Sequence, residues 1–449
     1  MIDLSIQDAA AALRAGTISA RQLTEAALLR IAVRNDRLHA VTHLNPNALT
    51  EADRADAMLA AGLGGAMCGI PFLVKDLIDV ADLPATSGSA VLAGRIAETD
   101  ADAVARLRAQ GAVVLGKVAT YEFAMVGPDL TLPDPPARNP WNRAHITGGS
   151  SSGSAAAVAG GMVRFALGTD TGGSIRSPSA YCGCVGLKPS YGRVARAGAF
   201  PLSPSLDHTG PLAASVTDAA LALDAITEHP ENWRPSAAKL GQGARGLRIG
   251  YARDWFATDP QAAPALVRAM DDAAAQFSML GARITPIPLP DYAPYEAAAS
   301  VILHAEALAE HRDLIRAKAA LYGRPVLQCL AFGAAISEVE LTQARLAQTS
   351  LTAAMLAAMQ GFDLILTATT LTPALPFSAF DGEKAVWTPM RTIAFNLTGQ
   401  PAISVPIGFD SSLPLGMQLV GRMGDEDLIC AAAHGYEQAT DHSCQRPPL

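Results

Sequence analysis

Cysteine is scarce in this chain, and its scarcity argues against a disulfide-stabilised protein. Six cysteines in 449 residues are too few for a disulfide framework, and no CxxC motif is followed by a second one, as in many zinc sites. Cys182 and Cys184 stand close together, but no cluster of carboxylates accompanies them. We therefore predict reduced thiols, no metal ion and no cofactor.

A strong excess of one charge and a long apolar run are also missing. The net charge is −8, from 34 basic and 42 acidic residues, so the composition does not favour binding to nucleic acid or to an anionic membrane. No apolar run approaches the ~20 residues of a membrane span, and the first ten residues lack the basic start of a signal peptide. We expect a cytoplasmic monomer or homodimer that acts on a small-molecule substrate, without nucleic acid or membrane partners.

Hydrophobic residues, by contrast, make up 50% of the chain, and helix and strand patterns alternate along much of it. Residues 3–62 are predicted to be helical, with a capping box at Ser19 and Gln22. Further helices are predicted at 100–110, 215–226, 259–280, 295–360 and 425–438, and strands at 112–115, 165–167, 247–252, 283–288, 364–370, 402–408 and 417–420.

This alternation predicts an α/β fold with a mixed central β-sheet covered by helices on both sides. We expect one domain over residues 1–449. Its parts are an N-terminal helical segment (1–65), a core (66–227), a polar, linker-like loop rich in proline and glycine (228–246), and a C-terminal half (247–449) that completes the sheet and the substrate pocket.

Two turns rich in glycine and serine lie within residues 147–176, separated by one helix and one strand. The first contains G-x-S-x-G at 149–153, which in an α/β-hydrolase would make Ser151 the nucleophile. That motif must follow a buried strand, however, and the preceding segment 138–146 is polar and contains a proline. A phosphate-binding loop is disfavoured too, since no GK[ST] ending is present. The second turn places Ser174 just after the predicted strand at 165–167, and backbone N–H groups there are candidate oxyanion donors.

Lys75 is the third candidate, because it lies inside the apolar run MCGIPFLVKDLIDV. Burial disfavours the ammonium form and lowers the pKa of a lysine, which would allow it to act as a base near neutral pH. The alternative is that Lys75 extends to solvent or pairs with Asp76 or Asp79.

Longer motifs then resemble one family. The chain resembles the signature region of the amidase signature family in three stretches: GGSSSGSAAAVAGG, ALGTDTGGSIRSPSAYCGCVGLKPSYGRV and SLDHTGPL. It resembles the flanking blocks of that family in three more: GIPFLVKDLIDV, AFNLTGQPAISVPIGF and LPLGMQLVGR. The resemblance implies a Ser–cis-Ser–Lys triad, with Ser174 as nucleophile, Ser150 as bridging serine after a cis peptide from Gly149, and Lys75 as base. It also implies that Ser151, Asp170 and Arg176 support the site. The oxyanion hole would consist of the N–H groups of Thr171, Gly172, Gly173 and Ser174.

The substrate is less closely specified. Ser152 stands where the family usually has glycine, and residues 125–136 lack its usual Thr-Glu-Asn-Ser run. We predict a roomy, apolar substrate-binding site formed by Tyr121, Met125, Gly149, Tyr181 and the apolar loop at 200–202. We therefore expect a hydrolase of aryl or alkyl amides, of the aryl acylamidase or urethanase kind, with carbamates (urethanes) as a second substrate class. The alternatives are a glutamine-amidase subunit of a tRNA amidotransferase and a catalytically silent binding protein with the same fold.

Overall fold

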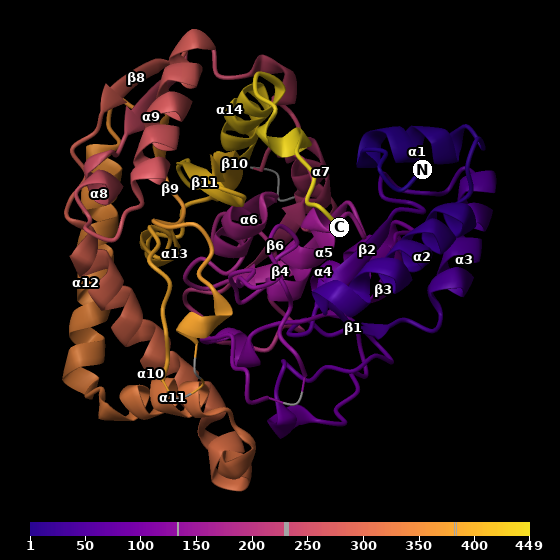
Figure 1. The fold of residues 1–449 in the computed structure, drawn as a ribbon, viewed down its shortest axis with the longest axis horizontal. Coiled ribbons are helices and arrows are strands. Elements are labelled where there is room, and N and C mark those ends of the chain that lie inside the picture. The colour runs from indigo at the N-terminus through magenta and orange to yellow at the C-terminus, as the bar shows by residue number, and fades with distance from the viewer. Residues whose placement is uncertain (133, 229–232, 381, 383) are drawn as a thin grey trace.

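The computed structural model describes residues 1–132, 134–228, 233–380, 382 and 384–449. One twisted sheet runs through the middle of the molecule, from the N-terminal third to the long C-terminal helices (Figure 1). Its order is β1-β3-β2-β4-β6-β5-β10-β11-β9-β7-β8. The strands are β1 (Val41–Leu44), β2 (Pro71–Lys75), β3 (Val113–Val118), β4 (Phe165–Asp170), β5 (Val185–Lys188), β6 (His208–Ala213), β7 (Arg248–Tyr251), β8 (Arg283–Pro286), β9 (Leu364–Ala368), β10 (Ala402–Asp410) and β11 (Leu413–Val420).

The sheet is mixed, as the alternation of elements predicts. β2 runs parallel to both β3 and β4, and β7 runs parallel to both β8 and β9. Between these two parallel groups, β4, β6, β5, β10, β11 and β9 pair antiparallel. The pairing of β5 with β10 joins the N-terminal and C-terminal halves of the chain into one sheet.

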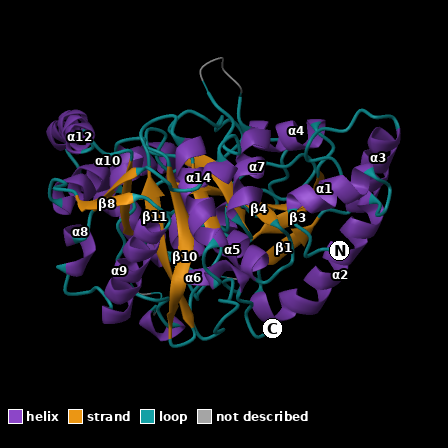
Figure 2. Ribbon diagram, turned by 90° about the horizontal axis from the view of Figure 1, so that it is seen from above, coloured by secondary structure: helices purple, strands orange, loops and turns teal. Residues whose placement is uncertain are grey.

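Helices lie on both sides of the sheet (Figure 2). In chain order they are α1 (Ile6–Arg14), α2 (Ala20–Leu38), α3 (Ala48–Ala60), α4 (Asp102–Ala109), α5 (Ser152–Ala159), α6 (Arg176–Cys182), α7 (Val216–Ile226), α8 (Asp254–Ala257), α9 (Pro264–Met279), α10 (Tyr292–Lys318), α11 (Arg324–Ala335), α12 (Glu338–Ala358), α13 (Ala394–Leu397) and α14 (Glu426–Gln438). Helices α10, α11 and α12 pack mainly on one another and form an arm at the end of the sheet opposite the N-terminal helices (Figure 1).

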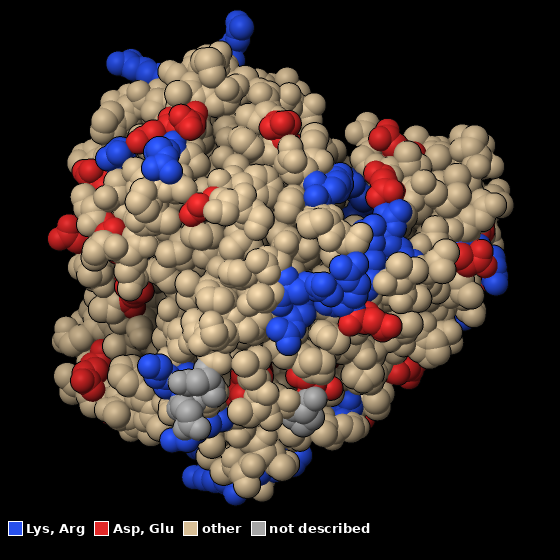
Figure 3. Space-filling view, viewed as in Figure 1, with Lys and Arg blue, Asp and Glu red and all other residues tan. Residues whose placement is uncertain are grey.

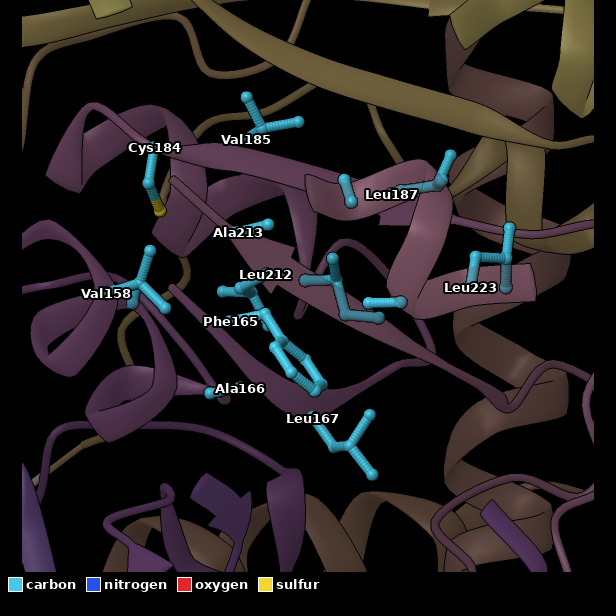
Figure 4. Packing of buried hydrophobic residues seen from close by; sticks show 14 of the residues in the cluster. Val158, Phe165, Ala166, Leu167, Cys184, Val185, Leu187, Leu212, Ala213 and Leu223 are labelled. Atoms are coloured by element: carbon cyan, nitrogen blue, oxygen red, sulfur yellow. The ribbon is translucent and has the colours of Figure 1, made fainter. Parts of the chain in front are cut away.

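The centre of the core lies where α5 and α7 pack on strands β4, β5 and β6. Figure 4 shows Phe165, Ala166 and Leu167 of β4 among the buried residues of neighbouring elements, and the strand register places Ala166 opposite Leu212 of β6. Phe165 also stacks on Phe72 of β2, at 5.3 Å between ring centroids. This packing fixes the ends of β2 and β4, and the site is built at those ends.

Two expectations about the elements are corrected by the structure, and one is confirmed. Residues 41–44, predicted to lie in a helical segment, form strand β1, because they pair antiparallel with β3 and tertiary pairing overrides a weak local pattern. The helix expected from Asp259 begins at Pro264, a favoured first helical residue, while Asp259 instead accepts a hydrogen bond from Arg391. The capping box at Ser19 and Gln22 is present.

The predicted linker is described at residue 228 and over 233–246, and residues 233–246 pack against the body of the protein; residues 229–232 lie outside the described residues. Arg234 and Lys239 both pair with the buried Asp427 of α14, at 2.9 and 3.0 Å. Ser236 is fully buried and accepts a hydrogen bond from Arg193. This segment is therefore a packed connection rather than a free spacer.

Candidate active site

Lys75 ends strand β2 and is fully buried. Its Nζ donates hydrogen bonds to Ser150 Oγ and Thr169 Oγ1, each at 2.7 Å. The neighbouring Asp76 instead pairs with Lys117, at 2.9 Å, so within the described residues Lys75 has no ion-pair partner. Burial lowers the pKa of Lys75 to about 7, although the more distant Asp170 and Asp207 oppose the shift.

Ser150 lies in the turn that leads into helix α5. The Gly149–Ser150 peptide is cis. A side chain at position 149 would not fit, because a Cβ there would overlap the Tyr121 ring. The small residue lets the backbone lie directly on the aromatic ring, which positions Ser150 over Lys75.

Ser174 lies in the second turn, between β4 and α6, and is half-buried at the wall of a cavity. The two turns are joined by a hydrogen bond from the Ser151 N–H to the Ser174 carbonyl, at 3.2 Å. Among the described residues, the Ser174 hydroxyl has no hydrogen-bond partner, and the N–H groups of residues 171–174 donate none. The hydroxyl and these donors are therefore available to a bound carbonyl group.

Glycine at position 173 lets this turn form. Its φ is +139°, and a Cβ there would overlap Thr392 Oγ1. The Thr392 hydroxyl donates to the Gly172 carbonyl and holds the turn from the C-terminal half of the chain. The backbone of the turn is thus fixed from outside its own sequence.

A buried ion pair between Asp170 and Arg176 supports the second turn. Asp170 and Arg176 are completely buried, 2.9 Å apart, and Arg176 also donates to Asn396 and Gln418. Burial alone would raise the pKa of the Asp170 carboxyl, but the Arg176 charge and hydrogen bonds hold that pKa well below its ordinary value. Asp170 also accepts the N–H of Ile175 and so anchors the residue after Ser174.

Ser151, the serine that the short G-x-S-x-G motif would select, is turned away from the cavity. Its hydroxyl donates to the Thr169 carbonyl at 3.2 Å and accepts the Thr169 N–H at 3.3 Å. These bonds tie α5 to β4, and Ser151 does not line the cavity. The preceding segment 138–146 takes part only in isolated bridges, from Arg138 to Ile146 and from His145 to Pro376, and does not form the buried strand that the G-x-S-x-G motif needs.

A cavity of about 350 Å³ opens beside Ser174. Its wall is mostly apolar and comes from distant parts of the chain: Tyr121, Ala124, Met125, Val126, Gly127, Gly148, Gly149, Thr171, Gly172, Gly173, Ser174, Leu202, Tyr292, Glu296, Ser300, Leu303, His304, Val386, Trp387, Thr388, Met390 and Ile393. Sequence patterns identify the glycine-rich turns, Tyr121, Met125 and Leu202. They miss the residues of α10 and those at 386–393, which carry no motif.

Tyr181 does not fit the prediction that it binds substrate. It is fully buried in α6 and packs beneath Gly148, where a Cβ would come within 2.5 Å of its ring. The reason is that Tyr181 is buried in a cluster with Ile146 and Phe377 and is not among the residues that line the cavity. Cys182 and Cys184 are free and buried, and no group of three or more His, Cys, Asp or Glu in the described chain is placed to hold a metal ion.

Comparisons with known proteins identify the family and the fold. A family model described as Amidase matches residues 22–430. The chain belongs to the amidase signature family. The native peptide amidase of Stenotrophomonas maltophilia is 32% identical to this amidase, with a TM-score of 0.86 over 100% of this chain and 98% of that one. A bacterial aryl acylamidase of the amidase signature enzymes is 25% identical, with a TM-score of 0.87 over 99% of both chains.

Curated relatives of this amidase carry another name. The A subunit of glutamyl-tRNA(Gln) amidotransferase from Geobacter sp. (strain M21) is 35% identical over 490 residues, covering 100% of both chains. The same protein of Roseiflexus sp. (strain RS-1) is 36% identical, covering 99% of this chain and 98% of the relative. These relatives are subunits of an enzyme named for a tRNA.

That finding contradicts the expected partners of the amidase. A monomer or homodimer with only a small-molecule substrate and no nucleic acid is the wrong prediction for a chain whose curated relatives are such subunits. The prediction relies on net charge, which averages over the surface. Figure 3 shows Lys and Arg gathered in a band across one face, whereas Asp and Glu are scattered. Within the described residues, no helix is long and apolar enough to cross a membrane.

Proposed function

We propose that this amidase hydrolyses C–N bonds through an acyl-enzyme formed on Ser174. The observation that carries the proposal is the position of Lys75, which is fully buried, has no ion-pair partner among the described residues and lies 2.7 Å from Ser150 Oγ. A buried lysine with a pKa of about 7 is neutral in a large fraction of molecules at physiological pH and can accept a proton.

The proposed reaction begins with attack of Ser174 Oγ on the substrate carbonyl carbon. Ser174 gives its proton to Ser150, and Ser150 gives its own proton to Lys75. The N–H groups of residues 171–174 stabilise the oxyanion, since the described structure leaves them without acceptors. When the C–N bond breaks, Lys75 returns the proton through Ser150 to the leaving nitrogen. Water then repeats the sequence to release the acid.

The cavity supports substrates with apolar groups beside the amide. Its described lining is dominated by Met125, Leu303, Trp387 and similar side chains and contains no lysine or arginine. We therefore propose aryl or alkyl amides as the substrate class, with carbamates of aromatic amines as a second class, because the same nucleophile can attack that carbonyl.

A second candidate function is the glutamine-amidase subunit of a tRNA amidotransferase. The curated relatives, which match the chain over its whole length, favour this candidate more strongly than the first. The composition of the cavity opposes it, because the α-carboxylate of free glutamine would find no cationic side chain in the described lining.

One experiment tests the reaction and separates the candidates. The chain is treated with a fluorophosphonate probe, and its release of aniline from acyl anilides and phenyl carbamates is compared with its release of ammonia from glutamine. We expect a covalent adduct on Ser174 and turnover of the anilides. Turnover of glutamine alone would support the amidotransferase function. An adduct on Ser151 would overturn the assignment of the nucleophile, and the absence of both adduct and turnover would indicate a binding protein.

A further inference from the structure

One face of helix α10 contributes polar side chains to the cavity wall. Tyr292, Glu296, Ser300 and His304 follow one another at intervals of four residues and all line the cavity. From Glu296 to His304 this face extends about 12 Å along the helix axis. Among the described residues, none of its side chains hydrogen-bonds to Lys75, Ser150 or Ser174, the three residues of the proposed proton relay.

Glu296 is the one carboxylate in the described lining, and no lysine or arginine accompanies it there. It is exposed at the cavity wall, and among the described residues it has no hydrogen-bond or ion-pair partner. A carboxylate with no internal partner, beside an apolar cavity, attracts a positive charge and repels a negative one.

His304 adds a second acceptor on the same face. Its Nδ1 lies 2.7 Å from the Ser300 carbonyl oxygen, an obligatory acceptor, so Nδ1 carries the proton and Nε2 keeps its lone pair. Burial lowers the pKa of His304, so the ring is neutral at physiological pH. The ring is fixed against Phe332, with 4.9 Å between ring centroids.

From this arrangement we infer that the amidase selects substrates that carry an ammonium group on an apolar chain, with Glu296 as the residue that determines this preference and His304 Nε2 as a further acceptor. The inference rests on the proposed function, since it specifies the substrate of the same cavity. An amino amide without a carboxylate fits the wall, because its charge meets Glu296 and its methylene groups meet the apolar side chains. A substrate with a carboxylate at the same distance does not fit, because no cation in the described lining compensates it.

The test uses three 4-nitroanilides of similar length that differ only at the far end of the acyl chain: 6-aminohexanoyl (ammonium), heptanoyl (methyl) and the monoanilide of adipic acid (carboxylate). We expect kcat/KM to decrease in that order. We expect Glu296→Gln to lower the ratio of kcat/KM for the ammonium substrate to that for the methyl substrate by about fivefold, the size of a partly solvated ion pair.

Glu310→Gln is the matched control, because Glu310 is exposed on the same helix but does not line the cavity. We expect this variant to leave the ratio unchanged. Equal loss in both variants would show a long-range charge effect and would overturn the inference, as would no preference in the unmodified chain. If none of the three anilides were hydrolysed, the result would instead count against the proposed function, so the two failures are distinguishable.

Discussion

The signature region at 147–176 and the α10–α12 arm both border the cavity, but they are built in opposite ways. The signature region is almost completely buried, and its polar groups bond to one another and to Lys75: Lys75 to Ser150, Asp170 to Arg176, Ser151 to Thr169. The arm is partly exposed, and among its described residues it presents to the cavity polar side chains, the apolar Leu303 and one carboxylate, that of Glu296. In the proposed function, the reaction therefore depends on a buried hydrogen-bonded network, and substrate preference depends on a partly exposed helix.

The largest expected effect is on the nucleophile. Ser174→Ala removes the attacking oxygen, so we expect kcat/KM to fall by at least about 10⁴-fold. Activity is measured by aniline release, and folding by thermal unfolding. Ser177→Ala is the control, because this buried hydroxyl, three residues further on, has no hydrogen-bond partner among the described residues. If Ser174→Ala stayed active while Ser151→Ala lost activity, Ser151 of the G-x-S-x-G motif would be the nucleophile.

The base gives the next largest effect. Lys75→Met should lower kcat by about 10³-fold, because the proton of Ser174 then has no acceptor beyond Ser150. In the unmodified chain the base must be neutral, so kcat/KM should rise about tenfold per pH unit below pH ~7 and level off above it. A pH–rate profile measures this, and Lys75→Met should lack the rise.

Lys188→Met is the comparison for that profile. Lys188 is also fully buried, and burial lowers its pKa well below the ordinary value, but its Nζ donates to the carbonyls of Pro189 and Gln400 and it does not line the cavity. We expect this variant to lose stability and keep the pH dependence. A profile that changed in Lys188→Met but not in Lys75→Met would contradict the assignment of the base.

Stability should differ between buried and exposed ion pairs in the same molecule. Asp170→Asn leaves the buried Arg176 charge without its partner, so we expect the free energy of unfolding to fall by about 3–5 kcal/mol. Arg253→Met breaks an exposed pair with Asp271 and should cost less than about 1 kcal/mol. Denaturant unfolding measures both values. Equal losses would show that the buried Asp170–Arg176 pair contributes no more to the free energy of unfolding than an exposed ion pair.

The smallest effect is expected in the wall contributed by the C-terminal half. Trp387 lines the cavity and is 53% exposed, so Trp387→Ala should raise KM for anilides about tenfold and leave kcat nearly unchanged, through lost apolar contact. Leu356→Ala, an exposed apolar residue outside the lining, is the control. A large fall in kcat instead would mean that this wall also holds the reacting atoms in place.

The sequence predicts the signature region at 147–176 better than it predicts the α10–α12 arm, for physical reasons. Lys75 in an apolar run and the paired glycine-serine turns are local signals, and the family motifs surround them. The helical character of α10 is predictable, but which of its faces meets Ser174 depends on packing across hundreds of residues, so Glu296 and His304 cannot be identified from the sequence. Strand β1 is missed for a similar reason, because its four residues are a strand only through pairing with β3.

The pairing of β5 with β10 has a consequence for how this chain can be divided. Residues Ala402, Ile403 and Ser404 meet Lys188, Leu187 and Gly186 in the middle of the sheet. Either half alone would expose this seam as a bare edge strand, with unpaired N–H and C=O groups and an apolar face. Fragments cut between α7 and β7 should therefore aggregate when expressed singly. When expressed together they should reassociate through the pairing of β5 with β10, so the chain is suited to fragment complementation.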